Sequence, residues 1–286
     1  MRWTPGDVSG DIEDRRDSSG GGGFGFGGGG IPFGIGGLLV LLVLSFIFKR
    51  DLISPFLHPG SPGASTAVRR PEDPARKAAE SREVQFVSFV LDDTQSDWDR
   101  LIPHYRHAKL VLFRDEINSP CGQAGTATGP FYCPGDEKVY LDLGFFDELR
   151  TRFRASGEFA QAYVIAHEIG HHVQKILGIE RTVRAEQQRN PRAANQLSVL
   201  LELQADCFAG VWGNSTEQRN LIDQSDVASA LNAAAAVGDD RLQKQATGRV
   251  MPDKFTHGTS AQRTHWFKTG LDSGSIKSCN TFSSGP

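Results

Sequence analysis

One segment of the chain sets several titratable groups into what is otherwise an apolar helix. It reads AQAYVIAHEIGHHVQKILG over residues 160–178 and carries HEIGHH at 167–172. The apolar spacing predicts a helix over 157–178, with Gly178 as its stop. Burying polar or charged groups is costly unless a partner compensates them. This helix is therefore predicted to be built around a polar site.

The spacing of these residues indicates which of them act together. His167 and His171 are four residues apart, so on a helix their side chains share a face, about 40° apart. Both imidazoles can then bind one cation at about 2.0–2.1 Å. Glu168 flanks that cation and can reach a water there, which gives H-E-x-x-H the mechanics of a zinc hydrolase. His172 lies about 140° round from His167 and is predicted not to be a ligand. Gly170 keeps this face slim, so that a partner helix can approach.

A third ligand is expected from a second helix, predicted over 193–213, which contains LELQADC. Glu202 and Asp206 are four apart on one of its faces, and a lone carboxylate among leucines would be costly. We expect Glu202 to bind the metal and Asp206 to accept the outer N–H of a ligand histidine. Two alternatives stay open: the two roles exchanged, or Glu202 on a solvated amphipathic surface. Cys207 points elsewhere, which favours a disulfide or core cysteine over a ligand.

The chain as a whole has 286 residues and a formal net charge of −3. This length can bury a real core, and the near-neutral charge argues against nucleic acid as a partner. Residues 1–30 are polar and then glycine-rich, which predicts a disordered segment. The patch DIEDRR at 11–16 is interpreted as part of a solvated tail, with a docking or topology signal as the alternative.

The apolar run IPFGIGGLLVLLVLSFIF over 31–48 is closed by Lys49 and Arg50. As a helix it would be about 27 Å long, close to the hydrocarbon thickness of a bilayer. It predicts a single-pass membrane anchor over 31–50, with a cleaved signal peptide or a buried core helix as alternatives. Residues 51–80 are rich in proline, glycine and small polar residues and are predicted to be a linker. The folded domain is then expected over 81–286.

The cysteine count bears on the compartment. The four cysteines allow two disulfides. Cys121 and Cys133 flank one turn-rich loop and are expected to pair locally, so Cys207 would pair with Cys279. Two disulfides would place the domain outside the cytoplasmic membrane; four reduced cysteines in the cytoplasm are the alternative. Basic residues flank the apolar run on both sides and leave its orientation open.

The rest of the domain is predicted to be mostly helical, with a few strands that precede the C-terminal helices. This layout is an α+β fold with a small β-region, preceded by one transmembrane helix. Strands are expected over 108–113 and 138–143. Further helices are expected over 84–102, with a break at DDT, over 145–153, and over 224–245, with Ser225 or Asp226 as its cap.

These motifs together resemble a known family. HEIGHH followed by ELQADCFAG, behind a glycine-rich lead and one apolar run, is similar to the neutral zinc metallopeptidase family of bacterial membrane-anchored proteins. The blocks MRW, EDRR, FYCPGDEKVYLDLGFF and THGTSAQRTHWFKTG resemble others of that family, so the likeness covers nearly all of the chain. H-E-x-x-H with a later E-x-x-x-D also resembles the gluzincin metallopeptidases. The likeness implies a zincin-like domain with one Zn²⁺ per chain, the ligands His167, His171 and Glu202, and Glu168 as base.

A hydrolytic mechanism needs more than these four residues. Glu168 would take a proton from water and pass it to the leaving amine, and an oxyanion donor is needed besides the metal. His257 is the candidate donor, with Tyr163 and His265 behind it, although His257 could equally be an exposed loop residue. Arg263 would orient that loop through a carboxylate. The strand over 138–143 could offer an edge for an extended substrate, as the gluzincin likeness suggests, or be an ordinary internal strand.

The favoured function is a membrane-anchored zinc endopeptidase acting on a peptide or protein. A metal-stabilised binding or assembly protein and a zinc amidase for cell-wall peptides are the alternatives. Glu168 favours catalysis, because a purely structural metal site needs ligands but no base.

Overall fold

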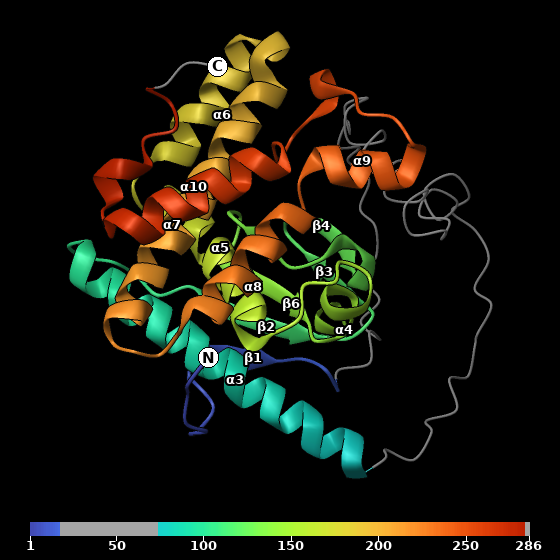
Figure 1. Ribbon diagram of the computed structural model, residues 1–286, viewed down its shortest axis with the longest axis vertical. Coiled ribbons are helices and arrows are strands. Elements are labelled where there is room, and N and C mark those ends of the chain that lie inside the picture. Colours follow the sequence, from blue (N-terminus) through green and yellow to red (C-terminus); the bar gives the residue numbers. More distant parts are fainter. Residues whose placement is uncertain (18–73, 284–286) are drawn as a thin grey trace, which may run out of the picture.

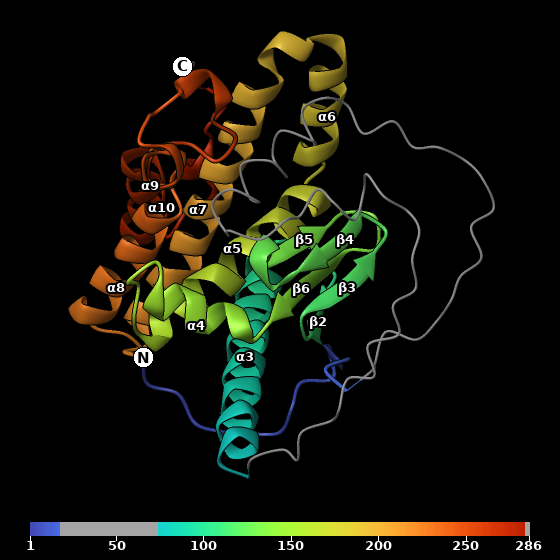
Figure 2. The same cartoon turned by 90° about the vertical axis from the view of Figure 1, so that its right-hand side faces the viewer.

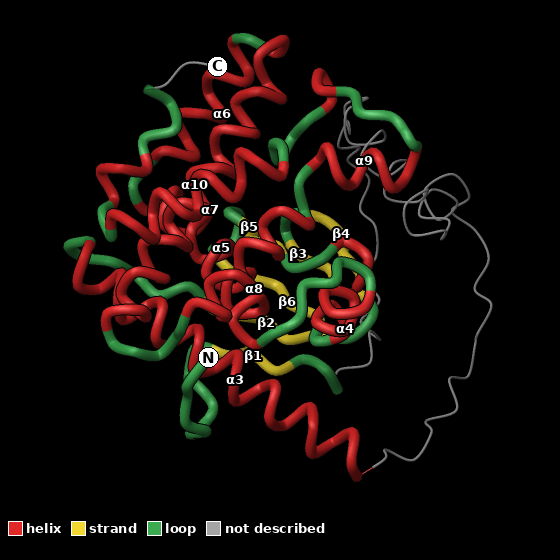
Figure 3. Tube along the Cα trace, in the orientation of Figure 1, coloured by secondary structure: helices red, strands yellow, loops and turns green. Residues whose placement is uncertain are grey.

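The computed structural model describes residues 1–17 and 74–283. Figures 1 and 3 show a helical body with a small sheet against it. The described helices longer than one turn are α3 (Pro74–Leu101), α4 (Gly144–Thr151), α5 (Glu158–Ile176), α6 (Ile179–Arg189), α7 (Ala194–Gln218), α8 (Gln224–Ala236), α9 (Asp239–Thr247) and α10 (Ser260–Ser273). The strands are β1 (Ile12–Asp14), β2 (Lys109–Phe113), β3 (Glu116–Ser119), β4 (Gly122–Gly125), β5 (Phe131–Cys133) and β6 (Lys138–Asp142). This mostly helical α+β layout is the predicted fold class.

The main sheet has the strand order β1-β2-β6-β5, and β3 and β4 form a separate hairpin. β1 and β6 run parallel to β2, whereas β5 runs antiparallel to β6. The strand expected over 138–143 is β6. It lies between β2 and β5, so of the two interpretations left open the internal strand is right and the free edge is wrong. β5 occupies that edge of the sheet instead.

Helix α5 is central to the fold and is buried along most of its length. It contacts α3, α7 and α8 as well as strands β5 and β6. Figure 2 shows it between the sheet and the helices α7, α8 and α10. A helix covered on so many sides must be apolar around most of its circumference, which accounts for the nearly continuous apolar sequence on both sides of the motif. Gly178 has φ 72° and follows the helix, as predicted.

Glycines allow the helices that carry the site to cross closely. A Cβ added at Gly170 on α5 would lie 3.0 Å from the backbone oxygen of Ala205 on α7. The slim face predicted at Gly170 is therefore a close helix crossing. On the other side of α7, a Cβ at Gly210 or Gly270 would collide with the backbone of the facing helix, so α7 and α10 also lie backbone to backbone.

Residues 1–17 are part of the folded body. The disorder expected over 1–30 is wrong for these residues, because β1 pairs with β2 and Trp3 packs on Phe86 with ring centroids 5.3 Å apart. The glycine-rich composition belongs to residues 20–30 alone. Averaging over that composition concealed the different character of residues 1–17, which have apolar side chains and a strand of their own. The remainder of that segment, the expected anchor over 31–50 and most of the expected linker lie outside the described residues.

Two predicted helix boundaries are also corrected. Helix α3 begins at Pro74, inside the expected linker, and runs through DDT without a break. The Thr94 hydroxyl there is buried and donates to the Val90 carbonyl, 2.7 Å away, so it is satisfied within the helix. The helix expected over 224–245 is two helices, α8 and α9. The chain breaks at Gly238, where a Cβ would overlap the backbone of Ser260, and α8 is capped by Asp223 instead of Ser225 or Asp226.

Both expected disulfides are present. Cys121 bonds Cys133 across the loop before β6, and Cys207 on α7 bonds Cys279 near the C-terminus. The second bond ties the last segment to the helix that carries Glu202.

Among the helices that the structure describes, none is both long enough and apolar enough to cross a bilayer.

Candidate metal centre

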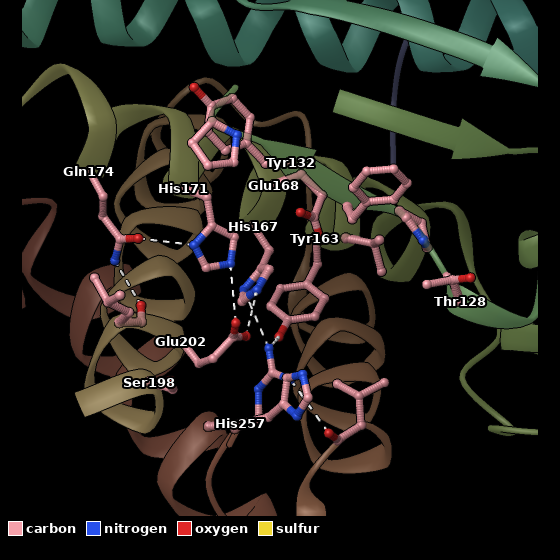
Figure 4. A pocket seen from close by; sticks show the side chains of 18 of the residues that line it. Thr128, Tyr132, Tyr163, His167, Glu168, His171, Gln174, Ser198, Glu202 and His257 are labelled. Atoms are coloured by element: carbon pink, nitrogen blue, oxygen red, sulfur yellow. Dashed lines mark hydrogen bonds and ion pairs between the residues drawn. The ribbon is translucent and has the colours of Figure 1, made fainter. Parts of the chain in front are cut away.

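Three side chains from two helices converge at the crossing of α5 and α7. His167 and His171 lie one turn apart on α5, and Glu202 faces them from α7 (Figure 4). The Nε2 atom of His167 lies 3.2 Å from Oε2 of Glu202, and that of His171 lies 3.5 Å from Oε1. One ligand atom from each residue lies within 4.8 Å of the other two. Among the described residues, this is the group that could hold a metal ion.

The outer nitrogens of both histidines have acceptors of their own. Nδ1 of His167 lies 2.8 Å from Asp206 Oδ1, and Nδ1 of His171 lies 2.9 Å from Gln174 Oε1. If each Nδ1 carries the proton and donates it to that oxygen, each Nε2 lone pair faces Glu202. Two imidazole nitrogens and a carboxylate are a donor set that zinc prefers. The residues present therefore fit a zinc ion.

Asp206 lies where a support for a ligand histidine was expected, and it does more than accept one proton. It is fully buried, and its carboxylate also receives two bonds of 2.8 Å from Arg263 on α10 and one of 2.5 Å from the Tyr163 hydroxyl. Burial disfavours the carboxylate, but Arg263 and His167 outweigh it and lower the pKa of Asp206. The network holds an anion beside His167 and fixes the orientation of its ring.

The charges in the site are strongly coupled. Burial disfavours the imidazolium of His167, but Asp206 and Glu202 outweigh burial and raise its pKa to about 10. Burial likewise opposes the Glu202 carboxylate, yet His171 and His167 hold the pKa of Glu202 well below its ordinary value. The site therefore attracts positive charge at the position between the histidines and Glu202. A divalent cation there would displace a proton from His167.

Glu168 lies beside this group and keeps a distinct environment. It is 7% exposed and lines the cavity in front of the histidines. Burial raises the pKa of Glu168, against the opposing effects of the two histidines and of a backbone hydrogen bond from Tyr132. A raised pKa brings a carboxylate closer to the neutral range in which a general base works.

The cavity has a volume of about 470 Å³ and opens in front of the metal group. One part of its lining is polar and includes the three candidate ligands and Glu168. The rest is largely apolar and includes Phe131, Phe145, Phe153, Val164, Val237 and Leu242.

Strand β5 forms one wall of this cavity through Phe131 and Tyr132. Its position is held from behind by His172, the third histidine of the motif. The Tyr132 hydroxyl lies 3.0 Å from Nδ1 of His172, whose Nε2–H donates to the Arg106 carbonyl 2.6 Å away. His172 is fully buried and stands outside the metal group, as predicted.

The candidates for the oxyanion donor differ in whether they line the cavity and whether their proton is already donated elsewhere. His257 lines the cavity and is held by Asp239, whose Oδ2 accepts its backbone N–H at 2.6 Å and whose Oδ1 lies 3.2 Å from Nδ1. The Tyr163 proton is already donated to Asp206. His265 lies on α10 against Trp266 and is not among the residues that line the cavity. Arg263 does contact a carboxylate, as expected, but that carboxylate is Asp206 and not part of the loop at 257.

Three contributors were missed in the sequence. Gln174 could have been found, because it lies three residues after His171 on the same helix face. Asp239 follows a helix break that the periodicity did not show. The role of β5 as a cavity wall depends on the order of strands in the sheet, which cannot be predicted from the local sequence.

Comparison with known proteins agrees with this geometry. Residues 1–282 match the family model described as "Putative neutral zinc metallopeptidase". The chain is 47% identical over 287 residues to "Uncharacterized protein YpfJ" of Escherichia coli strain K12, covering 99% of each. It is 44% identical over 197 residues to "Uncharacterized protein Rv2575" of Mycobacterium tuberculosis strain H37Rv, covering 65% of this chain and 66% of that one. No solved structure matches the chain. Since the family model spans nearly its whole length, the chain belongs to this neutral zinc metallopeptidase family.

Proposed function

We propose that the chain is a zinc-dependent endopeptidase in which His167, His171 and Glu202 hold the metal and Glu168 is the general base. The observation that carries the proposal is the convergence of the three ligand atoms within 4.8 Å, with a buried carboxylate in the adjoining cavity. A structural zinc site is closed by four protein ligands, whereas a catalytic one keeps a position open. Three candidate ligands facing a cavity favour the catalytic kind.

Bound zinc would polarise a peptide carbonyl and lower the pKa of water in the open position toward about 7. The protein's own groups supply the proton transfers. Glu168 accepts the proton of the attacking water and later gives it to the leaving amine. Its burial suits both steps, because a raised pKa makes Glu168 a stronger base toward water and keeps the accepted proton on it more readily.

The substrate would bind as an extended strand along β5. This strand pairs on one side with β6 and lines the cavity with Phe131 and Tyr132. A peptide added to its other side would gain backbone hydrogen bonds and pass in front of Glu168. The apolar part of the cavity would take a large apolar side chain beside the cleaved bond.

His257 is the proposed donor to the oxyanion that forms during attack. Its side chain is 47% exposed, and partial desolvation opposes its imidazolium, but Asp239 and Glu202 outweigh that desolvation and raise its pKa. A protonated His257 could donate a hydrogen bond where negative charge develops.

The two disulfides support an oxidising compartment for this domain. We propose that it works outside the cytoplasm at the membrane surface, held there by the apolar run over 31–48.

The decisive experiment compares three proteins: the wild type, Glu168→Gln and Glu202→Ala. Bound zinc is measured by elemental analysis, and cleavage is measured with a peptide library containing large apolar residues. We expect about one zinc per chain in the wild type and in Glu168→Gln, with cleavage only by the wild type. Glu202→Ala should lose both zinc and cleavage.

The same experiment distinguishes the alternatives. Zinc-loaded wild type that cleaves nothing would support a metal-stabilised binding protein. Cleavage of cell-wall peptides in preference to protein would indicate an amidase. Cleavage by Glu168→Gln at the wild-type rate would remove Glu168 from the mechanism.

A further inference from the structure

The N-terminal segment, residues 1–17, completes the fold of the domain. Strand β1 adds a parallel strand to the main sheet, with Ile12, Glu13 and Asp14 opposite residues 110–112 of β2. The Leu110 N–H donates to the Asp11 carbonyl at 2.8 Å, and the Arg15 N–H donates to Leu112 at 2.8 Å. Backbone hydrogen bonds of this kind form only when both strands share one folded body.

Side-chain contacts along the segment reach several other elements. Trp3 packs on Phe86 of α3, and its indole N–H donates to Glu158 at the start of α5 over 3.1 Å. Glu13 pairs with Lys138 of β6 at 2.6 Å. In Figure 2 the blue trace crosses α3 from the N-terminus toward the edge of the sheet. The segment is therefore bound along its length and not at a single point.

Two described residues close to the two ends of the gap in the chain also meet. Arg16 precedes residues 18–73, Glu80 follows them, and the Arg16 guanidinium lies 3.4 Å from the Glu80 carboxylate. Glu80 also pairs with Arg114, just after β2. The hydrocarbon core of a bilayer is about 30 Å thick. Residues on its opposite faces cannot form an ion pair.

We propose that residues 1–17 and 74–283 lie on the same side of the membrane. A single crossing by the apolar run over 31–48 would place β1 and β2 in different compartments, which their pairing excludes. The proposal therefore stands against the single-pass topology expected from the sequence. Because both disulfides lie in the same body, the shared side is the oxidising one.

Sidedness can be measured on the full chain with single introduced thiols. All four native cysteines are paired, so a membrane-impermeant maleimide reacts only with an introduced cysteine. Thr4→Cys reports on the N-terminal segment and Arg192→Cys on the domain, since both side chains are exposed. In sealed vesicles from cells that express the chain, we expect both thiols to be labelled or both protected. The pattern should invert together in vesicles of opposite orientation. Labelling of one thiol with protection of the other would overturn the proposal, and detergent should expose both as a control for sealing.

A charge exchange tests whether the segment is docked in the working protein. Glu13→Lys and Lys138→Glu should each lower the thermal midpoint of the full chain, and the double variant should recover part of the loss. If the double variant instead loses the sum of the two single losses, Glu13 and Lys138 do not interact and β1 is not docked, which would sink the proposal. Neither measurement uses peptidase activity, so its outcome is independent of the proposed function.

Discussion

Adding one methyl group at Gly170 should separate the two helices that hold the metal ligands. A Cβ at this position would lie 3.0 Å from the backbone oxygen of Ala205, 3.1 Å from its Cα and 3.3 Å from its Cβ. Ordinary contacts of a Cβ begin near 3.4 Å. Gly170→Ala therefore requires α7 to move away from α5 by about 0.4 Å, because backbone atoms cannot rotate aside as a side chain can.

The expected cost is small for folding and larger for the metal. Overpacking of this kind costs about 1–3 kcal/mol, and alanine regains about 1 kcal/mol over glycine in a helix, so the net loss should be about 0–2 kcal/mol. Glu202 lies one turn from Ala205 and would move with it. Metal–ligand distances tolerate about 0.2 Å, half of the required shift. We expect the zinc affinity to fall by about tenfold or more, by analogy with the loss of outer-shell support.

The assay is a zinc titration against a competing chelator, run beside denaturant unfolding of the same samples. Gly213→Ala is the matched control, because it makes the same change on α7 but the one close neighbour of its Cβ would be the end of the Leu271 side chain, at 3.1 Å, and the two other neighbours, both ring atoms, lie at ordinary contact distances. That variant should bind zinc like the wild type. Wild-type zinc affinity in Gly170→Ala would refute the argument that the glycine sets the ligand geometry.

Three further predictions follow from other contacts. Asp206→Asn should lower zinc affinity about 10–100-fold, and by leaving Arg263 buried without a counter-charge it should cost about 3–5 kcal/mol of unfolding free energy; a chelator titration and denaturant unfolding would check the two losses. Burial opposes charge on His107, but Asp99 and Asp11 outweigh it and raise its pKa, so its stabilising contribution should be full below about pH 6.5 and vanish as pH rises through the raised pKa. The thermal midpoint of His107→Gln should therefore fall below that of the wild type most at pH 5.5 and least at pH 9. Replacing both Cys207 and Cys279 by serine should cost about 4 kcal/mol on loop entropy, against about 3 kcal/mol for the Cys121–Cys133 pair, because they close loops of 72 and 12 residues; equal losses in denaturant unfolding would contradict this account.

The core of the site could be predicted from the sequence because helical geometry is local. The four-residue spacings of His167 with His171 and of Glu202 with Asp206 fix which side chains share a face. Polar and charged groups in apolar helices then need partners, and the two histidines and the two carboxylates can serve as partners for one another. Gly170 signalled the close crossing that brings the two faces together. Each of these inferences depends on a stretch of no more than five consecutive residues.

The parts that failed depend on contacts between distant segments. β5 has only three residues, and its place at the sheet edge follows from how β2 and β6 pair, which no local pattern encodes. Arg263 finds Asp206 across 57 positions of sequence. The N-terminal segment was predicted to be disordered because its composition was averaged with that of the glycine-rich residues 20–30.

His172 shows why one helix carries so many titratable residues. Helix α5 faces α7 with two imidazoles, faces the cavity with Glu168, and faces strand β5 with the third imidazole. Burial lowers the pKa of His172, so it stays neutral, with one nitrogen donating to Arg106 and the other accepting from Tyr132. Tyr132 in turn supplies a backbone hydrogen bond to Glu168. The histidine that does not face the metal therefore holds the strand that positions the base, and a single rigid helix sets the ligands, the base and the substrate edge relative to one another.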